Sequence, residues 1–168
     1  MKFKTLIIFI FGLLFTAGGS GAVFALQHTQ KDGLFSMDVP AEWHWIEYPQ
    51  GVIITYPDGR TMAMDIEMAS NSRSFSQAEI KKNLKEADEK MITDGVKAHH
   101  GTLIDDKEIT VDGVYATRLD FKTSPPNPIT VAYIAFCHKG RAFTITYGSS
   151  DAERMLGLDD IAASFKFR

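Results

Sequence analysis

Two methionines and two histidines have the residue types and the spacing that could bind a metal ion. Met62 and Met64 are two residues apart, and His99 and His100 are adjacent. Thioether sulfur suits Cu(I), and alternate residues of a strand share one face, so the methionines suggest a copper site. The competing interpretation is a core stripe, because Ile66 shares that face and methionine fills irregular cores well.

The histidine pair matches no zinc motif by its spacing. Adjacent side chains diverge on a strand, whereas in a loop the two rings could converge with Asp105, Asp106 or His44. The alternative is that they are solvated loop histidines. No cofactor is implied by either interpretation.

Nucleophilic catalysis has one candidate pair, Cys137 and His138. Neighbouring residues of a strand point to opposite faces, so this thiol and imidazole cannot meet directly. Cys137 is the only cysteine, and an unpaired thiol could form an intermolecular disulfide after export. Gly-x-Ser-x-Gly, Walker A and Gly-x-Gly-x-x-Gly patterns are absent from residues 26–168. We therefore expect no enzyme activity.

Four residues are candidates for contact with a protein partner. Trp45 and Tyr48 are aromatic, as binding hot spots often are, and Pro125 and Pro126 lie in a stiff loop. The alternative for the prolines is a plain hairpin connection.

The first 25 residues have the pattern of a secretory signal peptide. Lys2 and Lys4 precede an apolar stretch over residues 6–15, and Val23 and Ala25 stand where the peptidase requires small residues. We expect cleavage after Ala25 and export to the periplasm or the medium. The alternative is a membrane anchor formed by uncleaved residues 5–27, which carry no charge.

Composition excludes two further classes of protein. The net charge is −3 and no basic run follows the first four residues, so a nucleic-acid partner is not expected. The only cysteine is far from the cleavage site, which excludes a lipoprotein.

The mature chain is predicted to be one α+β domain over residues 33–168, preceded by a flexible leader over 26–32. Alternating apolar residues predict strands, and Asp112-Gly113 is a strong hairpin signal. Ser76 and Glu79 have capping-box spacing before a helix that Gly95 would end.

The predicted faces of the helices follow from the same patterns. In the first helix the apolar stripe is Ile80, Leu84, Ala87 and Met91. A second capping box, at Ser150 and Glu153, predicts a helix that runs to Ala163. Strands, a helix, more antiparallel strands and a final helix indicate an antiparallel sheet flanked by helices.

The order of these motifs resembles PsbP-like domains, which include the DcrB-type envelope proteins of bacteria. The likeness rests on the run 35–40, Phe-Ser-Met-Asp-Val-Pro, followed by Trp43, on Val111-Asp112-Gly113, and on Ser164-Phe165. It covers residues 33–168 and implies an α/β/α sandwich around an antiparallel sheet. It also implies a non-catalytic accessory or binding module, and it supplies no catalytic residues.

Three functions follow as hypotheses from these observations. The first is an accessory module of the bacterial envelope that acts through a protein partner. The second is a small-molecule or metal binder, with Cu(I) as one possible ligand. The third is a hydrolase of unrecognised type.

Overall fold

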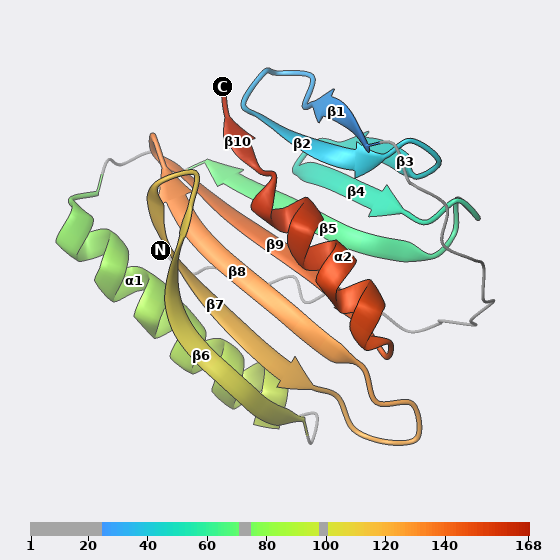
Figure 1. Cartoon of the computed structure of the whole chain (residues 1–168). Helices are drawn as coiled ribbons and strands as arrows, with labels where there is room; N and C mark the ends of the chain where they lie inside the picture. The colour runs from blue at the N-terminus through green and yellow to red at the C-terminus, as the bar shows by residue number, and fades with distance from the viewer. Residues whose placement is uncertain (1–24, 71–74, 98–100) are drawn as a thin grey trace.

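The computed structural model describes residues 25–70, 75–97 and 101–168 (Figure 1). In chain order the elements are β1 (Ala25–Thr29), β2 (Phe35–Pro40), β3 (His44–Tyr48), β4 (Gly51–Thr55), β5 (Met62–Ser70), α1 (Gln77–Lys90), a π-helical segment (Met91–Lys97), β6 (Thr102–Val111), β7 (Val114–Lys122), β8 (Thr130–His138), β9 (Arg141–Ser149), α2 (Ala152–Ala163) and β10 (Lys166–Phe167).

The large sheet is antiparallel throughout and has the strand order β3-β4-β5-β9-β8-β7-β6. Every neighbouring pair except β5 and β9 is also consecutive in the sequence. Asp112-Gly113 joins β6 to β7, and Lys139-Gly140 joins β8 to β9, with positive φ at all four residues. These two-residue turns match the twist of the strands, and the first confirms the predicted hairpin.

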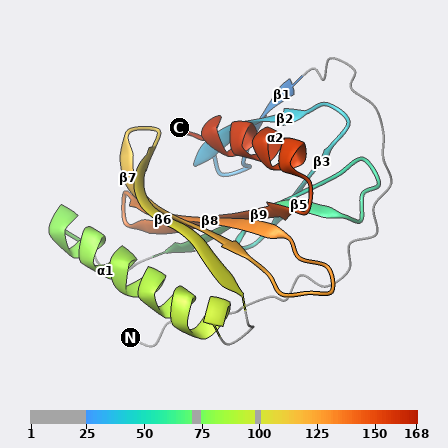
Figure 2. The same ribbon diagram turned by 60° about the horizontal axis from the view of Figure 1, so that its bottom comes forward.

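The layers confirm an α+β fold of the α/β/α type (Figure 2). Helix α1 packs on one face of the large sheet, against β7 and β8. Helix α2 packs on the other face, against β9, and beside it lies a small sheet of order β1-β2-β10.

The main core fills the space between the large sheet, α2 and the small sheet. The alternation of β2 places Phe35, Met37 and Val39 there with no solvent exposure. Phe165 follows α2 and stacks on Phe35, with ring centroids 4.8 Å apart. Because Phe165 is anchored in this way, the chain can continue into β10, which pairs with β2.

Helix α1 confirms the first capping box and corrects the predicted stripe. The Ser76 side chain accepts from the Glu79 N–H, and Glu79 accepts from the Ser76 N–H. Ala87 is exposed, and Asp88 faces the sheet instead. The helical path also continues past Gly95 to Lys97 as a π-helical segment.

Helix α2 begins one residue later than the second predicted capping box. Its N-cap is Asp151, whose side chain accepts from the Arg154 N–H at 3.0 Å, and the helix ends at Ala163 as expected. Aspartate is a common N-cap residue, because its short carboxylate can accept a hydrogen bond from the backbone N–H three residues later, as a serine hydroxyl does.

The predicted flexible leader is wrong in its first part. Residues 25–29 form β1, which pairs with the edge of β2, and Gln30 is buried. The sequence does not predict this strand, because its side chains are mostly exposed and form no apolar pattern. Backbone pairing with β2 holds it in place instead. The predicted signal peptide, apart from Ala25, lies outside the described residues. Within the three described ranges, no helix is long and apolar enough to cross a lipid bilayer.

Candidate functional site

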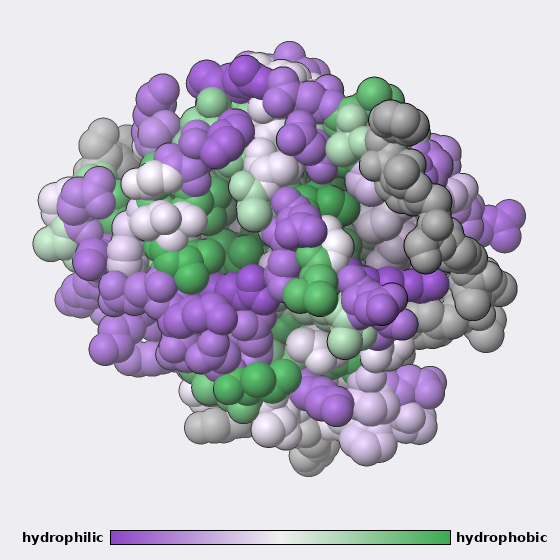
Figure 3. Space-filling model, viewed as in Figure 1, coloured by the Kyte–Doolittle hydropathy of each residue, from purple (hydrophilic) through white to green (hydrophobic). Residues whose placement is uncertain are grey.

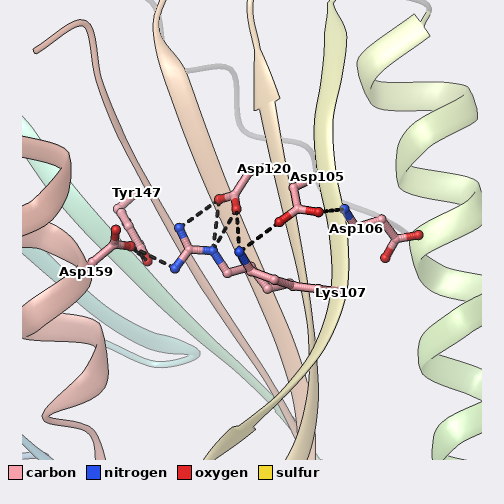
Figure 4. Close-up of polar contacts among 7 residues, drawn as sticks. Asp105, Asp106, Lys107, Asp120, Tyr147 and Asp159 are labelled. Atoms are coloured by element: carbon pink, nitrogen blue, oxygen red, sulfur yellow. Dashed lines mark hydrogen bonds and ion pairs between the residues drawn. The ribbon is translucent and has the colours of Figure 1, made fainter. Parts of the chain in front are cut away.

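Charged side chains occupy the part of the large sheet that α2 leaves uncovered. Figure 3 shows a hydrophilic area over β6 beside a more hydrophobic, green area. Five charged residues form a connected row that we call the charge ladder, drawn in Figure 4: Asp105, Lys107, Arg118, Asp120 and Asp159.

The register of the β6–β7 hairpin creates this row. Asp105 pairs with Asp120, and Lys107 pairs with Arg118. Like charges directly opposite one another destabilise a sheet, so each residue needs an opposite charge elsewhere. The alternation within each strand provides it, because residues two apart share a face and carry opposite signs.

The contacts of the ladder run from β6 to α2. Lys107 Nζ lies 2.8 Å from Asp105 Oδ2 and 3.6 Å from Asp120 Oδ2. Arg118 Nε donates to both carboxylate oxygens of Asp120, at 2.9 and 3.0 Å. Arg118 Nη1 lies 2.8 Å from Asp159 Oδ1 on α2. Arg118 is therefore the centre of the ladder and joins the sheet to the helix.

A tyrosine from β9 completes the inner end. The Tyr147 hydroxyl donates to Asp159 Oδ1 at 2.5 Å, and Arg118 Cζ lies 5.9 Å from the centre of the Tyr147 ring. Burial and this hydrogen bond raise the pKa of Tyr147, so its hydroxyl stays protonated at neutral pH.

Solvent exposure is lowest in the middle of the ladder and rises toward both ends; the Asp159 side chain on α2 is 32% exposed. The Arg118 and Asp120 side chains are 17% and 12% exposed, whereas those of Lys107 and Asp105 are 45% and 48% exposed. The hydrogen bond between them raises the pKa of Lys107 and lowers that of Asp105. The ladder thus has a largely buried middle, Arg118 and Asp120, and an outer end that presents one cation beside one anion. Such an arrangement suits charge-matched recognition of another surface.

The sequence prediction missed all of these residues except Asp105, which it placed in a different site. The signal that could have found Lys107 and Arg118 is the register of the Asp112-Gly113 hairpin, because counting residues outward from that turn places these two side chains opposite each other. Asp159 and Tyr147 carry no such signal, because their approach depends on how α2 lies on the sheet.

The methionine candidates differ in their surroundings. Met64 is completely buried in the main core, whereas Met62 is half-buried. A register shift between Ile54 and Thr55 interrupts the pairing of β4 with β5, so Thr55 pairs with Met62 and Ile54 with Met64. Copper binding by these thioethers stays a prediction.

The other metal candidates lie elsewhere. His99 and His100 are outside the described residues. Across residues 25–70, 75–97 and 101–168, no group of three or more histidine, cysteine or acidic side chains is arranged to hold a metal ion.

The four predicted contact residues do not form one surface. Trp45 stacks on His28 with ring centroids 5.4 Å apart, whereas the Tyr48 hydroxyl donates to Asp65 Oδ1 at 3.0 Å. Pro125 and Pro126 are exposed in the loop between β7 and β8, far from β3 in the strand order. Partner contact by these residues stays a prediction.

The fold of this chain is similar to that of several solved structures. The solution structure of cyanobacterial PsbP (CyanoP) from Synechocystis sp. PCC 6803 is similar with a TM-score of 0.65 and 14% identity, over 94% of this chain and 100% of that one. The chain has a PsbP-like fold. The resemblance seen in the sequence is thereby confirmed at the level of the fold.

Two further structures share parts of the PsbP-like fold. A Bacteroides thetaiotaomicron protein is similar with a TM-score of 0.56 and 14% identity, over 84% of this chain and 48% of that one. A Pseudomonas aeruginosa protein of unknown function has a TM-score of 0.51 and 9% identity, over 86% of this chain and 97% of that one. No family model matches the chain. No curated protein matches it in sequence.

Proposed function

We propose that this protein is a non-catalytic accessory module of the bacterial envelope, and that it binds a protein partner through the outer end of the charge ladder. The observation that carries the proposal is the pairing of Lys107 with Asp105 at 2.8 Å on an uncovered sheet face. Export, which the first 25 residues predict, supports the location.

The ladder favours recognition over chemistry. Burial lowers the pKa of Arg118, whereas its contacts, which include the hydrogen bonds to Asp120 and Asp159, raise it; the net shift is upward, so the side chain stays cationic. Its guanidinium holds Asp120 in a fixed forked contact. A group fixed in one charge state and one orientation discriminates between partners well and exchanges protons poorly.

The partner's chemistry follows from the exposed end. Lys107 and Asp105 together present a cation and an anion about half exposed to solvent. A complementary partner places a carboxylate near Lys107 and a basic group near Asp105. Its remaining contact area would lie over the uncovered faces of β6 and β7.

Site-specific photocrosslinking in intact cells tests this proposal. A photoreactive amino acid at Lys122, an exposed residue of β7 on the ladder face, is expected to capture one discrete protein in the envelope fraction. The matched control is Lys82 on α1, whose side chain is 74% exposed on the opposite side of the sheet. The adduct from position 122 should weaken strongly when Lys107→Glu reverses the outer charge.

Two results would overturn the proposal. One is the absence of any position-122 adduct. The other is an adduct that forms equally from position 82 or that survives Lys107→Glu unchanged. Recovery of the adduct outside the envelope would overturn the proposed location.

A further inference from the structure

A groove separate from the charge ladder runs between α2 and the segment that follows β2. It is open to solvent along one side and has a volume of about 490 Å³, which is within the range of pockets that hold small molecules. Six side chains set its chemistry: Asp38, Glu42, Trp43, Tyr56, Arg154 and Asp160.

Two aromatic rings form the apolar part of the wall. Trp43 precedes β3 and Tyr56 follows β4, and their ring centroids are 4.5 Å apart with planes tilted by 59°. Both rings pack with one side against the main core and stay half-buried. Their positions are therefore fixed before any ligand arrives, which lowers the entropy cost of binding.

The groove already holds one cation against an aromatic ring. Arg154 Cζ lies 5.7 Å from the centre of the Tyr56 ring. The negative face of an aromatic ring attracts cations, and tryptophan does so most strongly. The Trp43–Tyr56 pair is thus an environment in which a positive group is stabilised.

Carboxylates stand on both walls of the groove. Asp38 and Glu42 come from β2 and the segment after it, whereas Asp160 comes from α2, and all three are exposed. The lining contains three carboxylates and one guanidinium, so it carries a net negative charge. A ligand that matches both walls has positive groups at its two ends and an apolar chain between them.

We propose that this groove binds a small linear polyamine, whose terminal ammonium groups pair with carboxylates on the two walls while its methylene chain lies along Trp43 and Tyr56. The site is independent of the charge ladder and of the proposed protein partner. Added salt should weaken the ammonium–carboxylate pairs much more than the contact of the methylene chain with the aromatic rings, because salt screens interactions between exposed charges.

Tryptophan fluorescence provides the test. The chain has two tryptophans, so Trp45→Phe leaves Trp43 as the single reporter. Spermidine titrated into this full-length variant at low ionic strength should change the Trp43 emission saturably with one site. The neutral chain 1,8-octanediol should bind at least tenfold more weakly.

Charge-matched variants make the result specific to the groove. Glu42→Gln with Asp160→Asn should weaken spermidine binding at least tenfold. Glu86→Gln with Glu89→Gln removes the same charge from exposed residues of α1 and should leave the affinity within twofold. Equal losses in both double variants, equal binding of the diol, or no saturable signal would each overturn the proposal.

Discussion

Asp88 of α1 accepts a hydrogen bond from the Thr117 hydroxyl of β7 at 3.1 Å, and both side chains are buried. A buried acid in a helix–sheet contact is unusual, because removing a carboxylate from water costs free energy. Burial raises the pKa of Asp88 to about 6; the hydrogen bond from Thr117 opposes this rise, and the charge of Asp106 adds to it.

The first prediction concerns the pH dependence of stability. The pKa of Asp88 is higher in the folded protein than its ordinary value of 3.8, so between pH 4 and 6 the folded state binds more protons than the unfolded state. The contribution of Asp88 to stability is therefore greatest at low pH and is lost as the pH rises through 6. Asp88→Asn keeps the acceptor for Thr117 and should raise the free energy of unfolding at pH 7.5 by about 1–2 kcal/mol.

Urea denaturation at pH 4.5 and pH 7.5 measures this difference. The gain from Asp88→Asn should shrink toward zero at the lower pH. Glu89→Gln removes an exposed charge from the next position of the same helix and should show no such trend. An equal effect of Asp88→Asn at both pH values would contradict the prediction.

The second prediction separates the buried middle of the charge ladder from its exposed outer end. Arg118→Met leaves Asp120 largely buried without its forked partner and should destabilise the fold by about 2–4 kcal/mol. Lys107→Met removes a cation that is 45% exposed and should cost less than about 1 kcal/mol. Chemical denaturation at neutral pH gives both values, and similar costs for the two variants would show that Arg118 is not the centre of the ladder.

The third prediction compares two glycines. A Cβ at Gly51 would lie 1.9 Å from the Ile66 carbonyl oxygen of the neighbouring strand, so Gly51→Ala must push β4 and β5 apart. We expect it to cost more than about 3 kcal/mol, in the range of severe steric mutations. Gly157 in α2 has open space around the same position, and Gly157→Ala should stabilise the protein by about 0.5–1 kcal/mol. Thermal unfolding of both variants tests the contrast, which fails if Gly51→Ala melts like the parent protein.

Local signals in the sequence determined several elements of this fold. The reciprocal contacts of Ser76 and Glu79 and the positive φ values of Asp112 and Gly113 involve residues at most three apart. Such interactions form within one turn of chain, so their residue types predict them directly. The burial of alternate residues in β2 followed from the same local logic.

Tertiary structure alone decided which side chains meet across elements. Whether Asp88 or Ala87 faces the sheet depends on how α1 is rotated about its axis over β7. In the observed rotation, the Thr117 hydroxyl of β7 donates a hydrogen bond to Asp88. The meeting of Arg118 with Asp159 depends on the placement of α2 across the sheet. Strand β1 exists because the edge of β2 offers unpaired backbone groups, which leave no mark on the side-chain pattern. The sequence thus determined the elements through short-range contacts, and packing between distant segments created the charge ladder and the groove.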